Sequence, residues 1–269
     1  MMWSTLVLAA AMAATPAQTG TLTLGGARVT HGELGPQRPD SKYFPGDIFF
    51  LSFDIEGISV DDSGNVKYVM EMAVTDKVGK EIFKQQPAER SDFLPLGGNK
   101  LPARAFVSIG LDQLPGTYTC TVKVTDKVTK AVETLKRPFE VVEKTFSLVQ
   151  VYTAGDPEGK IPAPAVGVSG QSVWVHFALV GFERDKVKKL PSIVVEMEVT
   201  GKDGVATLKK PTTVVIDKDV PESDIGIPLR FLLPMNRPGD FTVKLKATDK
   251  VSGKMSTVSL PILVLSPTR

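Results

Sequence analysis

The sequence is poor in the residues that most often perform catalysis. Its 269 residues include a single cysteine, Cys120, and only two histidines, His31 and His176. One cysteine cannot form an intrachain disulfide, and two histidines without a shared motif argue against a zinc site or a Cys/His dyad. The sequence also lacks a nucleophile elbow, a phosphate-binding loop and a dinucleotide fingerprint. We therefore expect that the protein is not an enzyme.

The chain also lacks a long run of charge of one sign. Its 32 Lys and Arg residues are interspersed with 30 Asp and Glu residues, for a net charge of +2. This balance argues against a nucleic-acid partner and against a polybasic membrane-binding patch. After the first twenty residues no apolar run approaches the ~18 residues that a spanning helix needs, so we expect no transmembrane segment in the mature chain.

The N-terminus resembles a secretion signal. Residues 3–14 (WSTLVLAAAMAA) form a short apolar stretch, and small residues follow it with cleavage sites after Ala13 or Ala17. We predict a signal peptide at residues 1–17 and a protein that is secreted, periplasmic or associated with the cell envelope. Because no disulfide is available, the mature protein must gain its stability from hydrophobic cores.

The chain contains an internal duplication. Three separate segments of its first half recur in its second half, in the same order and at nearly the same spacing. Agreement among three independent segments indicates two copies of one ancestral domain, with predicted boundaries at 18–143 and 144–269. The matched pairs are residues 46–57 (GDIFFLSFDIEG) with 170–181 (GQSVWVHFALVG), 69–75 (VMEMAVT) with 194–200 (VVEMEVT), and 115–122 (PGTYTCTV) with 238–245 (PGDFTVKL).

Both copies alternate apolar and polar residues with the period of a β-strand. One such row is Phe49, Leu51, Phe53 and Ile55, and no convincing helical stretch with caps interrupts the pattern. About seven short strands in each copy, separated by Gly, Pro and Asp turns, indicate a sandwich of antiparallel sheets with one wet face. The predicted fold is all-β: two tandem immunoglobulin-like antiparallel β-sandwiches that arose by internal duplication.

The tetrapeptide TDKV occurs three times, at residues 75–78, 125–128 and 248–251. Each occurrence follows an alternating strand and precedes another one. An aspartate side chain can accept a hydrogen bond from the backbone two residues further on, which closes a tight turn. We interpret TDKV as a hairpin connection that belongs to the scaffold, rather than as a binding motif.

Residues 111–120 (LDQLPGTYTC) resemble the corner before strand F of immunoglobulin-like domains, where a tyrosine stands two residues before a cysteine. The "VKVTD" that follows is similar to a strand end in bacterial immunoglobulin-like and polycystic-kidney-disease-like modules. The resemblance implies a β-sandwich in which the Tyr118 hydroxyl ties the corner. Cys120 has no partner cysteine, and the second copy has Phe241 and Val243 at these places. Such modules serve adhesion, spacing, glycan binding and domain presentation alike.

Two groups of residues are candidates for binding. Asp61, Asp62 and Asn65 surround a glycine in the loop DDSGN, and their oxygens suit calcium, but the spacing is not that of an EF-hand and favours an ordinary polar turn. Phe50 and Trp174 occupy the same repeat position with the parity of the polar face. They are candidate contacts for a glycan, a partner or the other domain, unless a loop covers them. We expect no cofactor, with calcium at the DDSGN loop as the one alternative.

These observations predict a non-catalytic, exported binding or structural module of the cell envelope or extracellular space. Its partner would be an envelope or extracellular protein or polysaccharide. One alternative is a carbohydrate-binding protein, although two tryptophans and four tyrosines offer little material for an aromatic platform. The other is an assembly or chaperone-like subunit that uses an exposed sheet edge.

Overall fold

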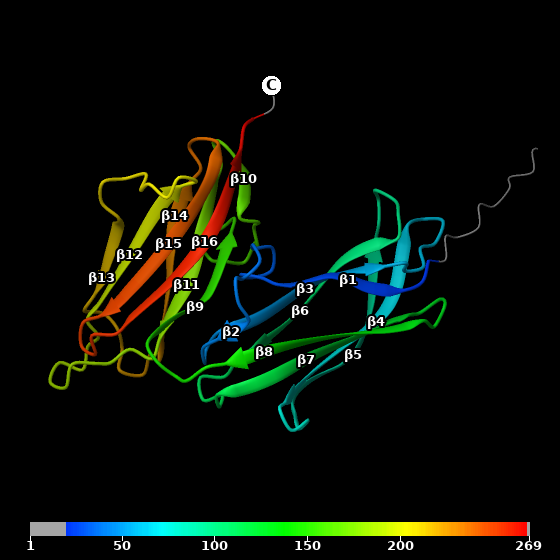
Figure 1. Ribbon diagram of the computed structural model, residues 1–269, viewed down its shortest axis with the longest axis horizontal. Coiled ribbons are helices and arrows are strands. Elements are labelled where there is room, and N and C mark those ends of the chain that lie inside the picture. The colour runs from blue at the N-terminus through cyan, green and yellow to red at the C-terminus, as the bar shows by residue number, and fades with distance from the viewer. Residues whose placement is uncertain (1–19, 268–269) are drawn as a thin grey trace, which may run out of the picture.

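The computed structural model describes residues 20–267, which form sixteen β-strands joined by turns and loops. The signal peptide predicted at residues 1–17 lies outside the described residues. No helix that could cross a membrane occurs between residues 20 and 267. Figure 1 shows two groups of strands along the long axis of the molecule, and the strands of the two groups run in different directions.

The first half folds as a three-stranded sheet and a five-stranded sheet that enclose a common core. The three-stranded sheet has the order β1-β3-β6, and the five-stranded sheet has the order β2-β8-β7-β4-β5. The strands are β1 (Thr23–Val29), β2 (Lys42–Tyr43), β3 (Ile48–Glu56), β4 (Asn65–Asp76), β5 (Glu81–Phe93), β6 (Lys100–Ser108), β7 (Gly116–Asp126) and β8 (Val132–Val141).

The second half repeats this topology strand for strand. Its sheets have the orders β14-β11-β9 and β10-β16-β15-β12-β13, so each strand of the first half has one counterpart at the same place. All pairings are antiparallel except those of the short edge strands β2 and β10. The strands are β9 (Ser147–Ala154), β10 (Val166–Val168), β11 (Ser172–Val180), β12 (Ile193–Gly201), β13 (Thr212–Ile216), β14 (Gly226–Pro234), β15 (Gly239–Asp249) and β16 (Met255–Leu265).

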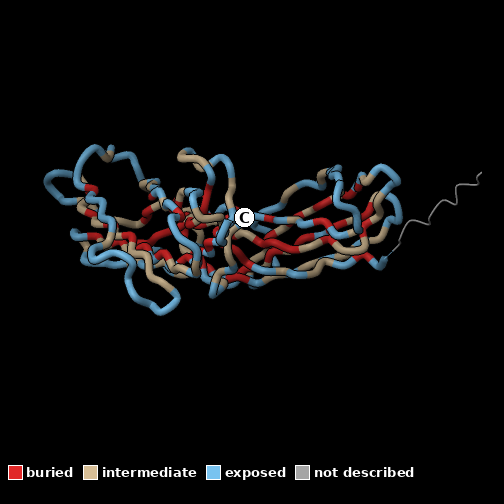
Figure 2. The backbone as a smooth tube through the Cα atoms, turned by 90° about the horizontal axis from the view of Figure 1, so that it is seen from above, coloured by how far each residue is buried: buried red, intermediate tan, exposed pale blue. Residues whose placement is uncertain are grey.

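This arrangement confirms the predicted fold of tandem immunoglobulin-like β-sandwiches. Each sandwich has eight strands rather than about seven, because the short edge strand that opens each five-stranded sheet carries almost no sequence signal. The alternating rows point inward as predicted: Phe49, Leu51, Phe53 and Ile55 are all buried, and Cys120 is buried beside them in the same core. A second, separate core fills the other sandwich. Figure 2 shows the buried positions running through both halves.

The glycines that follow β3 and β11 illustrate the geometry that the two sandwiches share. Gly57 and Gly181 take φ values of 71° and 67°, in the left-handed region that side chains disfavour. A Cβ atom on either one would lie 2.4 Å from a carbonyl oxygen, that of Thr21 or of Thr145. Glycine is therefore required at this position in both copies for the same steric reason.

The TDKV segments are hairpin connections, as predicted. Asp126 and Asp249 end β7 and β15, and both are buried. The Asp126 carboxylate accepts hydrogen bonds from the backbone N–H of Val128 and Thr129, and across the sandwich from that of Ser59. Burial opposes ionisation of Asp126, but these hydrogen bonds outweigh it and hold the pKa of its carboxyl below its usual value.

Asp249 repeats this arrangement in the second copy. Its carboxylate accepts hydrogen bonds from the Val251 and Glu183 N–H groups and from the Ser252 hydroxyl. Asp76, in the remaining TDKV segment, accepts from Val78 and Lys80 in an exposed turn and bonds nothing across the sandwich. The repeated aspartate is thus a structural group that ties a hairpin to a neighbouring loop in two of its three occurrences.

The tyrosine corner implied by the resemblance is present in the first sandwich. The Tyr118 hydroxyl donates to the Leu114 carbonyl oxygen at 2.7 Å and accepts from the Gln113 side-chain amide, also at 2.7 Å. Phe241 stands at the same place in the second sandwich, between the same strands, and cannot make either bond. This difference between the copies bears on the candidate site.

A polar joint connects the two sandwiches. The Gln150 N–H donates to Asp47 Oδ1 at 2.8 Å, and the Gln150 side-chain amide donates to the Gly46 carbonyl oxygen at 2.7 Å. Asp47 Oδ2 accepts from Arg38 at 3.0 Å. Gln150 has a φ of 53°, and Gly26 takes φ 60° in the corresponding strand β1. A non-glycine residue held in this region is a strained choice, and here its side chain bridges the sandwiches.

Candidate functional site

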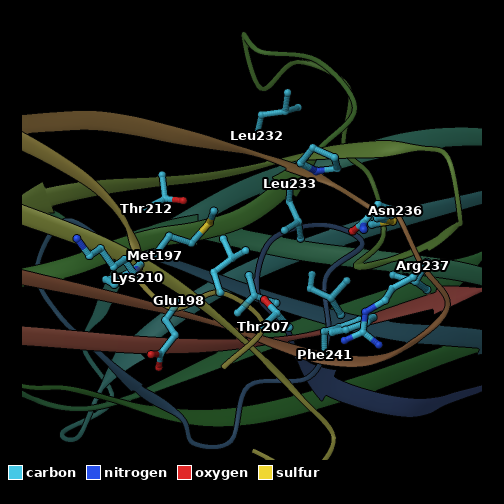
Figure 3. A pocket seen from close by; sticks show the side chains of 17 residues that line it. Met197, Glu198, Thr207, Lys210, Thr212, Leu232, Leu233, Asn236, Arg237 and Phe241 are labelled. Carbon is cyan, nitrogen blue, oxygen red and sulfur yellow. The ribbon is translucent and has the colours of Figure 1, made fainter. Parts of the chain in front are cut away.

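The second sandwich has an open apolar cleft where β12 and β14 end (Figure 3). In Figure 1 these two strands end at the same end of the sandwich as the C-terminus. The cleft has a volume of about 430 Å³. This lies within the range of roughly 300–1,000 Å³ for ligand pockets. Its apolar walls come from both sheets and from the loop between β12 and β13: Met197, Val199, Leu208, Leu232, Leu233, Met235, Phe241, Ile262 and Val264.

The cleft is open because the edge strand of the second sandwich is shorter than its counterpart in the first. In the first sandwich β5 pairs with β4 along its whole length and places Phe83 opposite Val74. The counterpart β13 pairs with β12 only over residues 212–216, and residues 202–211 form a loop. Val199 corresponds to Val74 but has Thr207 of this loop beside it, instead of a paired aromatic residue. The space that Phe83 covers in one copy is therefore left open in the other.

Substitutions inside the core widen the cleft further. The equivalent cavity of the first sandwich has a volume of only about 100 Å³. It is lined by Tyr118 and Phe139, which pair across β7 and β8. Phe241 and Ile262 form the equivalent pair across β15 and β16. Ile262 is smaller than Phe139, and Phe241 lacks the hydroxyl of Tyr118. The surrounding strands do not fill the space that these two substitutions leave.

Cationic side chains lie at the mouth of the cleft. The Arg237 guanidinium lies 4.8 Å from the centre of the Phe241 ring, within cation–π distance. Lys210 lines another part of the mouth, and Glu198 is the one carboxylate among the lining residues. Among the residues that the structure describes, neither Arg237 nor Lys210 forms an ion pair. An apolar interior with free cations at its rim can accept an apolar group that carries negative charge.

Phe50 lies outside this cleft. It is half-buried on β3, and its ring stacks on that of Phe106 of β6, with 5.5 Å between the ring centres. Phe50 also lines a smaller cavity of about 230 Å³ at the joint, together with Gln150 and Tyr152 of the second sandwich. The Phe50 side chain lies on the outward face of its sheet, as predicted, and some of the residues around it belong to the second sandwich.

Trp174 is the counterpart of Phe50 on β11. It is half-buried, and it pairs across the strands with Leu232 of β14, as Phe50 pairs with Phe106. The Arg230 guanidinium lies 5.7 Å from the centre of its ring. Leu232 lies at the edge of the cleft, so Trp174 is one strand away from the cleft mouth. The structure thus places the two nominated aromatics in two different surroundings rather than in one patch.

The loop with Asp61, Asp62 and Asn65 is closed by its own hydrogen bonds. The Asp61 carboxylate accepts hydrogen bonds from the backbone N–H groups of Ser63 and Asn65. The Asn65 side-chain amide donates to both of its oxygens. Hydrogen bonding from Asn65, and less strongly from Ser63, holds the pKa of the exposed Asp61 carboxyl below its usual value. Within residues 20–267 no group of three or more His, Cys, Asp and Glu side chains is placed to hold a metal ion. Calcium binding here stays an untested hypothesis.

The remaining reactive residue types are buried in structural positions. Burial raises the pKa of the Cys120 thiol to about 12, so that the thiolate is not populated. His31 is buried in the loop at the joint, and burial, followed by the nearby Arg38 guanidinium, lowers its pKa to about 4. The Val151 backbone acts in the opposite direction and raises this pKa. Neither ring nitrogen has a hydrogen-bond partner among the described residues. His176 stacks on Tyr152, with 5.0 Å between the ring centres.

Sequence reasoning missed the cleft residues, above all Arg237 and Ile262. The signal that could have found them lies in the duplication itself. Position by position, Phe241 replaces Tyr118 and Ile262 replaces Phe139, both at inward positions that face the same end of the sandwich. Loss of volume at two neighbouring inward positions of only one copy indicates a cavity in that copy.

No family model and no curated protein matches the sequence. The fold is similar to part of red sea bream transglutaminase, with 11% identity over 91% of this chain and 31% of that chain, at a TM-score of 0.29. It is also similar to the C-terminal domain of the Streptococcus pyogenes antigen I/II-family protein AspA, with 10% identity over 91% of this chain and 100% of that chain, at a TM-score of 0.31.

A third similar structure is Pseudomonas fluorescens alkylpurine DNA glycosylase AlkC bound to DNA containing an abasic site analog. Its identity is 20% over 45% of this chain and 30% of that chain, at a TM-score of 0.29. The chain thus spans about a third of the transglutaminase and of the glycosylase. Likenesses this weak carry no conclusion about activity or ligand.

Proposed function

We propose that the protein is a non-catalytic, exported binding module that takes up an apolar group in the cleft of its second sandwich. The observation that carries this proposal is the difference between two copies of one fold, about 430 Å³ in one and about 100 Å³ in the other. A merely structural tandem module gains nothing from an open core, because unfilled apolar volume costs stability.

The surroundings of the cleft support uptake from outside. Leu208 and Leu232 at its mouth are 65% and 43% exposed, although both are apolar. Within residues 20–267, strands β13 and β14 each pair with only one neighbour, so open sheet edges flank the cleft. Met197 and Met235 line it with flexible side chains that adapt to ligands of different shapes.

A neutral apolar dye tests the proposal directly. Nile red should bind the purified protein with a rise in fluorescence, and Ile262→Phe should abolish this rise, because it restores the phenyl ring that Phe139 provides in the first sandwich. Ile225→Phe is the matched control, since it makes the same change at an exposed position outside the cleft. Leu233→Phe provides a second way to fill the cleft, in case the first variant folds poorly.

The outcomes separate clearly. Binding by the wild type and by Ile225→Phe, with loss in a folded filling variant, supports the proposal. Absence of binding by the wild type, or equal binding by both filling variants, contradicts it. Export is tested separately by sequencing the N-terminus of protein recovered outside the cytoplasm of its native cell, where cleavage near Ala17 is expected.

A further inference from the structure

We infer that the ligand of the second-sandwich cleft is a monomeric amphiphile with one apolar chain and an anionic headgroup, such as a fatty-acid carboxylate. This inference rests on the proposed function of the cleft and goes beyond it by naming the chemical class that the cleft selects. The apolar chain would lie between the sheets, and the headgroup would remain at the mouth beside Arg237.

The interior of the cleft suits a single apolar chain. It is lined by aliphatic and thioether side chains from both sheets and has a volume of about 430 Å³. A chain of ten carbons fits this volume, because a methylene group occupies about the same 30 Å³ as a water molecule. Among the lining residues, Leu233 belongs to β14 of one sheet, and Phe241 and Ile262 belong to β15 and β16 of the other, so the chain would be enclosed on both sides.

The charges at the mouth favour an anion. Arg237 and Lys210 line the cleft without a carboxylate partner among the described residues, whereas Glu198 is the one acidic residue of the lining. The cation–π contact with Phe241 holds the Arg237 guanidinium next to the apolar wall, although the residue itself is exposed. A planar guanidinium presented in this way can donate two parallel hydrogen bonds to a carboxylate or to a phosphate oxygen pair.

The first sandwich shows what the same corner does without a ligand. There Gln113 and Leu114 bind the Tyr118 hydroxyl and close the corner. Asn236 and Arg237 stand at the equivalent places before the Pro-Gly of the second copy, and Phe241 has no hydroxyl for them to bind. The second corner has therefore exchanged an internal hydrogen-bonded closure for an exposed cation beside an open cleft.

Competition against Nile red measures the class of the ligand. Decanoate and decyltrimethylammonium carry similar apolar chains with opposite charge, and both are used below the concentrations at which they form micelles. We expect decanoate to displace the dye with a Kd about tenfold lower than that of the cation, because the exposed Arg237 guanidinium attracts the carboxylate and repels the ammonium. The preference should shrink as salt is raised. Arg237→Gln should reduce it to about threefold or less while Nile red itself still binds, and Lys246→Gln, on the outer face of the same sheet, should leave it unchanged.

The outcomes distinguish this inference from the function on which it rests. If Nile red binds but decanoate shows no advantage over the cation, or Arg237→Gln keeps the full advantage, the ligand class is wrong and the binding function stands. If Nile red does not bind, both fail. Sedimentation with phosphatidylglycerol vesicles, without displacement of dye by monomeric decanoate, would replace the free amphiphile with a membrane surface and overturn the inference.

Discussion

Replacing Asp249 with alanine should destabilise the second sandwich by about 3–5 kcal/mol. The carboxylate is fully buried and accepts three hydrogen bonds, from the Val251 and Glu183 N–H groups and the Ser252 hydroxyl. A hydrogen bond to a charged group contributes about 1.5–3 kcal/mol, and a buried donor left without a partner costs about 1–3 kcal/mol. Three such bonds sum to about 4.5–9 kcal/mol, and because water can reach part of this site after the truncation, the expected loss lies at or below the lower end of this sum.

The same tetrapeptide supplies two internal controls. Asp126→Ala should have a similar effect on the first sandwich, because Asp126 is buried and also bonds across to another loop, at Ser59. Asp76→Ala should cost only about 1 kcal/mol or less, since its two partners, Val78 and Lys80, lie in an exposed turn where water replaces the lost bonds.

Two native probes allow each sandwich to be followed by itself in urea. Trp174 is the only tryptophan outside the predicted signal peptide, so intrinsic fluorescence reports the second sandwich. Cys120 is the only cysteine and is buried in the first core, so its reaction with a thiol reagent reports the first sandwich. If Asp249→Ala lowers the free energy of unfolding by less than about 1 kcal/mol, or no more than Asp76→Ala does, the structural interpretation of the repeated aspartate is refuted.

Three further predictions concern single side chains. Cys120 should not react with a thiol reagent in the native protein at pH 8, because burial raises its pKa to about 12; fast reaction without unfolding would contradict this. Tyr118→Phe should lower the stability of the first sandwich by about 1 kcal/mol, measured by thiol exposure in urea. The substitution removes the hydroxyl to which the Gln113 amide and the Leu114 carbonyl are hydrogen-bonded. His31 has a pKa lowered from 6.5 to about 4 in the folded state, so its contribution is complete above pH 6.5 and is lost as the pH falls through 4. Between pH 7 and pH 4 the wild type should therefore lose up to about 3 kcal/mol that His31→Asn does not lose, and parallel pH profiles of the melting temperature would argue against this.

Much of the fold could be predicted because its signals are local and occur twice. Alternation places Phe49 and Leu51 inward whatever the neighbouring strand is. The hairpin role of Asp126 follows from the reach of a short carboxylate to the backbone two residues on, and the matched segments of the two copies fix which strands correspond. The tyrosine corner at Tyr118 likewise depends on residues only four apart in the sequence.

The surroundings of the outward aromatics could not be predicted in the same way. The parity of Phe50 and Trp174 is right, but parity says nothing of what stands on the next strand. Phe106 stacks on Phe50, while Leu232 and Arg230 lie beside Trp174. These neighbours come from strands more than fifty residues away, and their register is set only when the sheet forms.

The sequence by itself determined that this chain folds as two related β-sandwiches, because strand period, turn chemistry and repetition act within short segments. Only the tertiary structure decided that one of the two copies is open. That outcome depends on a short edge strand, on Ile262 facing Phe241 from another strand, and on Arg237 reaching back over the ring. A cavity is the volume that distant side chains fail to fill, so it exists only after the sheets have packed against each other.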